Sequence, residues 1–148
     1  MSTVIYEFDR QQYEDYCTAL QNLNGIYCYE EPYDTVVQYG IVGLYKICFD
    51  QCCNAMKEIM EFQGISEGAT GSPRQILKSA YQAGMIADET LWLDALNSRN
   101  NVSHAYNHVI ALDIVKKTKE SYYQMFCTLQ ENLEENWIDK NEAADISE

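Results

Sequence analysis

The stretch YDTVVQYGIVGLYKICFDQCCNAMKEIMEF, residues 33–62, decides the fold, because its apolar residues recur every three or four positions. We therefore predict a long helix from about Tyr33 to Phe62, ended by Gly64. Gly40 and Gly43 are poor helix formers, so we expect them to admit the close approach of another helix or to permit a kink. The apolar face consists of Val37, Ile41, Leu44, Cys48, Cys52, Ala55, Ile59 and Phe62.

Helical spacing continues on both sides of this stretch. Before it, a helix is expected from about Phe8 to Leu23, followed by a connection over residues 24–32. After it, a short helix should begin at Ser72 and end at Gly84, because Ser72-Pro73-Arg74-Gln75 has the form of a capping box with proline at the first helical position. The first helix would present one face made of Tyr13, Tyr16, Cys17 and Leu20.

Two further helices complete the prediction. One is capped by Asp88 and weakens at Asn100 and Asn101, and the other runs from about Asn107 to Glu134. Its apolar stripe would be Val115, Thr118, Tyr122, Met125, Leu129 and Leu133. We therefore predict an all-α, up-and-down bundle of four to five helices in a single domain, 1–148, whose acidic tail frays at about 136–148.

Composition indicates the class of protein and where it is located. The 47% hydrophobic content fits a folded domain, and no run of about 18 apolar residues predicts a membrane helix. The N-terminus lacks a basic start followed by an apolar core, so no signal peptide and a cytoplasmic location are expected. The six cysteines lack metal-site spacing and are interpreted as reduced thiols packed like small hydrophobes, so no metal or cofactor is expected.

Charge is distributed unevenly along the chain. The formal net charge of −13 argues against broad nonspecific binding to nucleic acid. Residues 131–148 contain seven acids and one lysine, whereas residues 74–119 contain six basic residues and four acids. The least acidic part of the chain is thus the part that permits local contact with a phosphate or RNA.

That segment contains RNNVSHAY, residues 99–106. Arg99 offers a planar, permanently charged fork that fits phosphate oxygens. A histidine such as His104 is the side chain best able to move a proton near neutral pH, and Tyr106 adds a hydroxyl. These residue types together suggest metal-independent cleavage of RNA through a cyclic phosphate, with His104 acting on a ribose 2′-hydroxyl or a leaving oxygen.

Helical geometry limits this interpretation. In a regular helix of about 3.6 residues per turn, Arg99 and His104 would lie roughly 140° apart. Either the helix is broken between them, or a second copy of the chain completes the site, and we expect both. Taken alone, an arginine and a histidine at a helix end are more often caps or surface residues. By the same default Tyr106 packs, and His108 lies at the surface or in a cap.

A longer stretch favours a functional role for this motif over a merely structural one. SPRQILKSAYQAGMIADETLWLDALNSRNNVSHAYN, residues 72–107, resembles the HEPN superfamily, in particular the nucleotidyltransferase substrate-binding proteins or HepT-like toxins. That group reads approximately SPR-x-x-I/L-x-x-A-F/Y-x-x-G-x-I, then W-L-x-x-L, then R-N-x-x-S/T-H-x-Y. The segment MKEIMEFQG, residues 56–64, also looks like the end of the family's long second helix.

The resemblance implies a HEPN homodimer with a composite site near its interface. It implies a metal-independent endoribonuclease toxin in which Arg99 and His104 are catalytic and Asn100 and Ser103 shape the turn. The implied partner is a minimal nucleotidyltransferase of the MNT type, which would silence the toxin by transferring AMP to Tyr106. The family's second helix often contains FELAWK, but residues 49–54 read FDQCCN here, so that only the acidic position survives, as Asp50.

Two alternatives remain open. In one, the protein is a non-catalytic substrate-binding subunit of a two-component nucleotidyltransferase. In the other, it is a general helical interaction domain whose motif has decayed. Both would lack ribonuclease activity.

Overall fold

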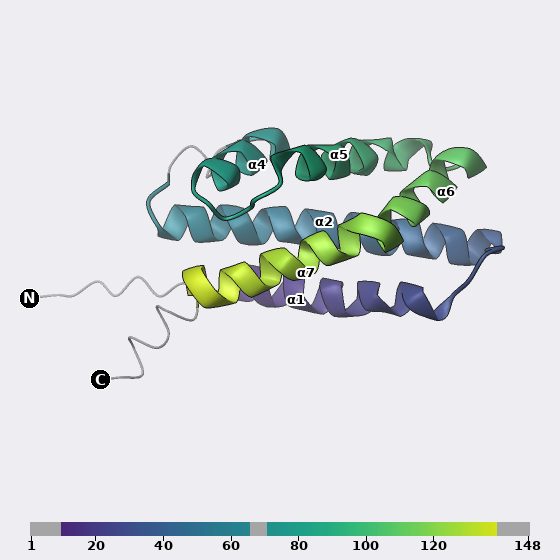
Figure 1. Cartoon of the computed structure of the whole chain (residues 1–148), viewed down its shortest axis with the longest axis horizontal. Helices are drawn as coiled ribbons and strands as arrows, with labels where there is room; N and C mark the ends of the chain where they lie inside the picture. Colours follow the sequence, from purple (N-terminus) through teal and green to yellow (C-terminus); the bar gives the residue numbers. More distant parts are fainter. Residues whose placement is uncertain (1–9, 66–70, 139–148) are drawn as a thin grey trace, which may run out of the picture.

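The protein folds as an elongated bundle of helices that lie along a shared direction (Figure 1). The computed structural model describes residues 10–65 and 71–138, and these ranges contain helices and no strand. The predicted all-α fold is therefore confirmed. The elements are α1 (Gln11–Leu23), η1 (Asn24–Cys28), α2 (Thr35–Phe62), α4 (Pro73–Gln82), α5 (Glu89–Asn100), η2 (Asn101–His104), α6 (His108–Lys117), η3 (Thr118–Tyr122), α7 (Tyr123–Asn132) and η4 (Leu133–Ile138).

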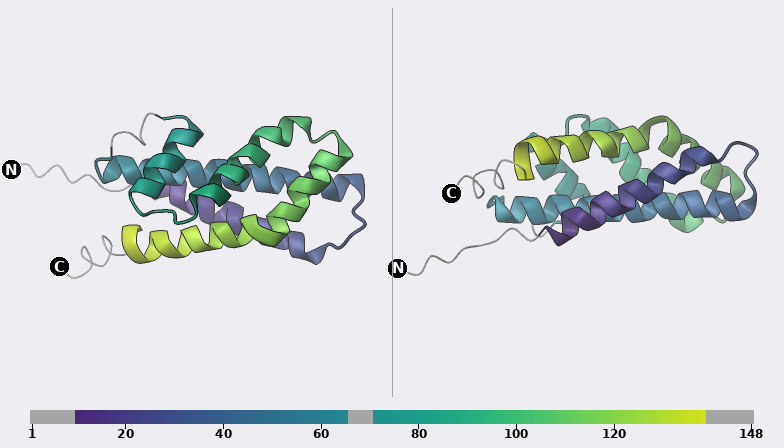
Figure 2. Two further views of the ribbon diagram at one scale, coloured as in Figure 1. Left: turned by 45° about the horizontal axis from the view of Figure 1, so that its top comes forward. Right: turned by 90° about the horizontal axis from the view of Figure 1, so that it is seen from below.

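The chain runs up and down the bundle, with α2 at its centre. α2 packs against α1 along much of its length and also contacts α4, α5 and α6. From α6 onward, α6, η3, α7 and η4 join into one long helix that returns beside α1 (Figure 2). Within the described residues, no helix combines the length and the apolar character needed to cross a membrane.

The predicted apolar face of α2 is largely the face that the bundle buries. The Asp34 carboxylate caps the helix by accepting a hydrogen bond from the Val37 amide at 2.8 Å. Phe62 departs from the prediction, because it is the last residue of α2 and 40% of its side chain is exposed at the end of the bundle. Five of the eight predicted positions are buried and two are half-buried; the buried ones are Ile41, Cys48, Cys52, Ala55 and Ile59.

The expected close approach of another helix to Gly40 and Gly43 is not found within the described residues. A β-carbon added to either glycine would meet nothing within 4 Å, so no helix of the same chain approaches them closely. α2 also continues through both positions as one α-helix of 28 residues. The two glycines therefore lie on an open surface of α2.

Local capping chemistry sets the start of α4 and α5 as predicted. The Ser72 hydroxyl accepts from the Gln75 amide at 3.4 Å, and the Gln75 side chain accepts from the Ser72 amide at 3.3 Å. α4 ends at Gln82, and Gly84 then adopts a φ of +78°, a conformation that favours glycine. The Asp88 carboxylate accepts from the Leu91 amide at 3.1 Å at the start of α5.

The last helix differs from the prediction in two respects. It contains two π-helical stretches, η3 and η4, and in η3 the Thr118 hydroxyl donates to the Ile114 carbonyl at 2.7 Å. It also continues to Ile138, which is 2% exposed, so fraying from residue 136 is wrong for residues 136–138. Burial of the apolar Ile138 side chain stabilises this last turn. The rest of the predicted acidic tail, 139–148, lies outside the described residues.

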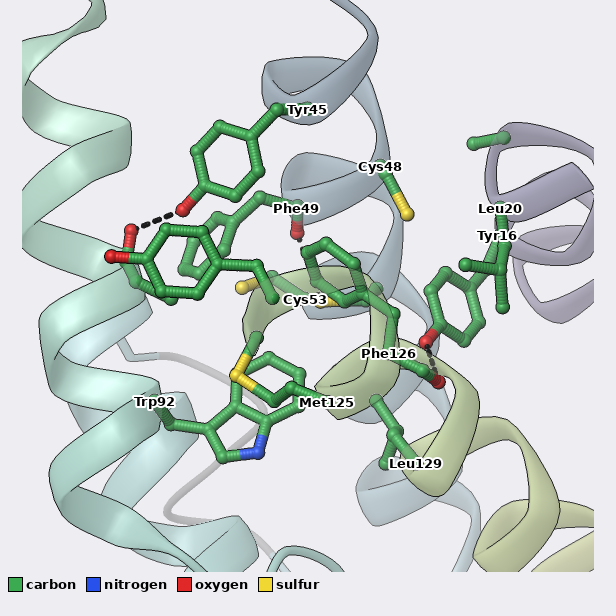
Figure 3. Packing of buried hydrophobic residues seen from close by; sticks show 14 of the residues in the cluster. Tyr16, Leu20, Tyr45, Cys48, Phe49, Cys53, Trp92, Met125, Phe126 and Leu129 are labelled. Carbon is green, nitrogen blue, oxygen red and sulfur yellow. Dashed lines mark hydrogen bonds between the residues drawn. The ribbon is translucent and has the colours of Figure 1, made fainter. Parts of the chain in front are cut away.

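The core is rich in aromatic side chains that interlock between helices (Figure 3). Phe126 packs edge-on against Tyr16 and Trp92, with ring centroids 6.4 and 5.8 Å apart. The buried Tyr16 hydroxyl donates to the Phe126 carbonyl at 2.7 Å, and the Tyr45 hydroxyl donates to the Ala95 carbonyl. These bonds satisfy polar atoms that would otherwise be costly to bury.

The six cysteines are free thiols in differing surroundings. Cys48, Cys52 and Cys53 are buried in the core as predicted, and burial raises the pKa of the Cys48 thiol well above its ordinary value. Cys28 is exposed and is not a packing residue. No group of three or more potential metal ligands occurs among the described residues.

Candidate functional site

The sequence RNNVSHAY lies where α5 ends and α6 has yet to begin. Arg99 belongs to the last turn of α5, and the chain then tightens into the 3₁₀ turn η2, which ends at His104. The buried Ala105 holds the turn against the core, and its amide donates to the Val102 carbonyl at 3.0 Å. The predicted departure from regular α-helix between Arg99 and His104 is therefore confirmed.

Side chains on either side of the turn fix its ends. The Ser103 hydroxyl donates to the Asn100 carbonyl at 3.4 Å, inside the turn. The Asn107 carboxamide oxygen accepts from the Val109 amide at 2.9 Å and so caps α6, which begins at His108. The Asn100 backbone carbonyl and the Ser103 hydroxyl thus contact each other inside the turn, and His108 is exposed.

Arg99 is held by a carboxylate from the second helix. Its Nε and one terminal nitrogen donate to the two oxygens of Asp50 at 2.7 and 3.0 Å, a bidentate pair that fixes the plane of the guanidinium. The hydrogen bond to Asp50 raises the pKa of Arg99 above its ordinary value. Lys46 also lies 3.6 Å from Asp50. The pair is half-buried, and Asp50 accepts from only two of the five guanidinium N–H groups.

Asp50 is the site residue that motif spacing did not identify. It is 49 positions from Arg99, so no local pattern joins the two residues. The family resemblance did contain a hint, because Asp50 matches the acidic position of the family's second helix.

His104 and Tyr106 lie in much more open surroundings. Both are exposed, and the side chain of Tyr106 is 78% exposed. Neither side chain has a hydrogen-bond or ion-pair partner within the described residues, although the Tyr106 carbonyl accepts from the Tyr39 hydroxyl at 3.2 Å. No hydrogen bond joins Arg99 to His104 within the described residues.

A buried polar network supports the end of α5. The Ser98 and Tyr122 hydroxyls are 2.7 Å apart, and the Tyr122 hydroxyl also donates to the Asp94 carboxylate at 2.7 Å. Burial raises the pKa of Tyr122 well above its ordinary value. Lys117 lies 3.7 Å from Asp94. This network joins α5 to the last helix at Ser98, the residue before Arg99, and helical spacing gave no indication of it.

An open apolar surface leads from the start of α2 towards Asp50. Four exposed residues and the half-buried Gly43 recur on it at helical spacing, so they share one face of the helix. Tyr106 and Val109, which are 78% and 74% exposed, extend the apolar surface beyond α2. We call the α2 part the glycine face; it consists of Val36, Tyr39, Gly40, Gly43 and Ile47.

The comparisons with known proteins agree with this architecture. A family model described as nucleotidyltransferase substrate binding protein like matches residues 11–135, which span α1 to η4 and include Asp50, Arg99, His104 and Tyr106. The chain belongs to this family. A search of curated proteins found no match.

As a nucleotidyltransferase substrate-binding-like protein, the chain belongs to the family that comprises the HepT-like HEPN proteins, so the resemblance seen over residues 72–107 is confirmed. The family name implies an association with a nucleotidyltransferase.

Proposed function

We propose that this nucleotidyltransferase substrate-binding-like protein is the toxin of a HEPN/MNT pair and that it cleaves RNA without a metal ion. The observation that carries the proposal is the bidentate Asp50–Arg99 pair beside the turn that presents His104. A guanidinium held in one orientation can stabilise charge that develops on a phosphate in the transition state. The imidazole of His104 is exposed, so it is accessible to the ribose 2′-hydroxyl, which loses a proton, and to the leaving oxygen, which gains one.

Cleavage would follow an in-line transfer. The ribose 2′-oxygen bonds to phosphorus as its proton passes to a base, and the P–O5′ bond breaks as that oxygen takes a proton from an acid. The products are a 2′,3′-cyclic phosphate and a 5′-hydroxyl. One imidazole serves one of these roles at a time, so a dimer with two copies of His104 in a single cleft would supply both base and acid.

The glycine face supports a dimer of this kind. It is apolar and exposed apart from the half-buried Gly43, and a β-carbon added to either glycine would meet nothing within 4 Å, which leaves room for a partner helix. A second copy packed on it would bury Val36, Ile47 and Val109 and bring another RNNVSHAY turn near Arg99. Burial of this surface on both copies would provide the driving force for association.

We further propose that Tyr106 is the point at which a partner nucleotidyltransferase silences the toxin. Its hydroxyl is exposed and has no hydrogen-bond partner among the described residues, so another enzyme can reach it. The tyrosine oxygen would bond to the α-phosphorus of ATP and pyrophosphate would leave, with the phenolic proton passing to a base of the partner. A bulky anion at this position would obstruct RNA binding at the adjacent histidine.

The alternative is a non-catalytic substrate-binding subunit of a two-component nucleotidyltransferase. The net charge of −13 favours it, because a strongly acidic chain repels RNA. Under this alternative the Asp50–Arg99 pair would be structural.

An RNA cleavage assay separates the two functions. Purified protein in EDTA is expected to cleave single-stranded RNA to products with cyclic phosphate ends, and His104→Ala is expected to abolish cleavage. His108→Ala is the matched control, since it removes an exposed histidine four residues away that lies outside the motif. Absence of cleavage by the wild type, or equal cleavage by His104→Ala, would favour the binding subunit.

A further inference from the structure

A pocket lined by none of the residues of the glycine face or of RNNVSHAY plays no part in the proposed RNA cleavage. It has a volume of about 670 Å³ and lies between the start of α5, with the loop that precedes it, and the last helix. Its floor is apolar and consists of buried side chains, among them Met85, Trp92 and Leu129. Figure 3 shows Trp92, Met125 and Leu129 close together in this part of the molecule. The size lies within the usual range for binding pockets.

The rim of this pocket is strongly acidic. Asp88, Glu120, Glu131 and Glu135 line it, and no lysine, arginine or histidine does. None of the four carboxylates forms an ion pair within the described residues. Lys119, the neighbour of Glu120, is directed elsewhere, since it donates to the Tyr29 carbonyl. The rim therefore favours a positively charged occupant.

The shape of the pocket selects the kind of occupant. Its helical wall extends from Glu120 to Glu135, a length of about 22 Å at 1.5 Å per residue. The opposite wall is held in place by Asn132, whose amide donates to the Met85 carbonyl at 2.7 Å. Both ends of the helical wall lie in π-helical stretches, η3 and η4, a feature that is frequent at functional sites. A groove of this length suits a peptide segment better than a small metabolite.

We propose that this pocket binds a segment of a partner protein in which apolar side chains are flanked by lysine or arginine. The apolar side chains would cover the Trp92 floor, and the basic ones would pair with Glu120 at one end and with Glu131 and Glu135 at the other. The chain's own ends have the wrong charge, since residues 1–9 contain Glu7 and Asp9 without a basic residue and residues 139–148 contain four acids and one lysine. The interaction is separate from RNA cleavage and does not depend on it.

Fluorescence of Trp92 provides the test. The chain has two tryptophans, so a Trp137→Phe background leaves Trp92 as the reporter. The probes are three capped peptides: RKLLKR, the basic peptide RKGGKR and the acidic peptide EDLLDE. We expect saturable binding of RKLLKR alone, weakened at least about tenfold by Glu131→Gln/Glu135→Gln and by added salt. Glu61→Gln, an exposed glutamate outside the pocket, is the control and should leave binding unchanged.

Three results would overturn the proposal. The first is no response of Trp92 to RKLLKR at millimolar concentration, and the second is equal binding of RKLLKR and RKGGKR. The third is a change of oligomeric state in Glu131→Gln/Glu135→Gln, measured by sedimentation, which would make a second copy of the chain the occupant. Since the readout involves no RNA, failure here is distinct from failure of the ribonuclease.

Discussion

Arg99 and His104 are five residues apart, yet they lie in opposite kinds of surroundings. Arg99 is half-buried, is paired with Asp50 from another helix, and follows Ser98, which is hydrogen-bonded to Tyr122 of the last helix. His104 is exposed and without a partner among the described residues. The contrast fits the proposal that helices of the same chain position Arg99, whereas a second chain would complete the surroundings of His104.

The largest effect on RNA cleavage should come from Arg99→Ala. It removes the oriented positive charge, and we expect kcat/KM for RNA cleavage to fall by about 10²–10³-fold. Arg99→Lys should be nearly as poor, because an ammonium cannot form the bidentate pair with Asp50. Initial rates on a defined single-stranded RNA provide the measurement, and wild-type rates for either variant would show that Arg99 has no part in catalysis.

A second contrast concerns stability. Tyr122→Phe removes a buried hydroxyl that is hydrogen-bonded to the buried Ser98 and to the half-exposed Asp94, so the free energy of unfolding should fall by about 1–3 kcal/mol. Tyr106→Phe removes an exposed hydroxyl and should leave stability unchanged. Urea denaturation of both variants, followed by circular dichroism, tests the pair. Equal stability of the two variants would mean that the buried network does not hold α5 in place.

The smallest effect should come from Asp50→Asn. The amide keeps the size of the carboxylate but loses one acceptor and the charge, so Arg99 would be less firmly oriented. We expect cleavage to slow by about tenfold, a loss typical of changes to a supporting group. Asp113→Asn, which alters an exposed carboxylate that is ion-paired with Lys117, is the control and should cleave normally. Equal rates for the two variants would make Asp50 merely structural.

The helices could be predicted from the sequence because their causes are local. The capping box at Ser72, the cap at Asp88 and the apolar spacing of the long helices each act within a few residues. The same reasoning misjudged Gly40 and Gly43, since a pair of small residues indicates room for a neighbour but not which chain supplies it. Phe62 matched the spacing and is nevertheless exposed, because spacing does not say where a bundle ends.

The candidate site was predictable only in part, for the same reason. RNNVSHAY supplied the residue types and the break in the helix, both of which depend on neighbours in sequence. The Asp50–Arg99 pair and the Ser98–Tyr122 contact join residues 49 and 24 positions apart. Such contacts depend on how whole helices pack, which no short-range pattern records.

Mixed dimers test most directly whether two chains share one site. Wild-type and His104→Ala subunits, exchanged in varying ratios at fixed total concentration, are assayed for RNA cleavage in EDTA. If each reaction requires His104 from both chains, activity should follow the square of the wild-type fraction, about one quarter at an equal ratio. A linear decline, with about half the activity at an equal ratio, would contradict the shared site.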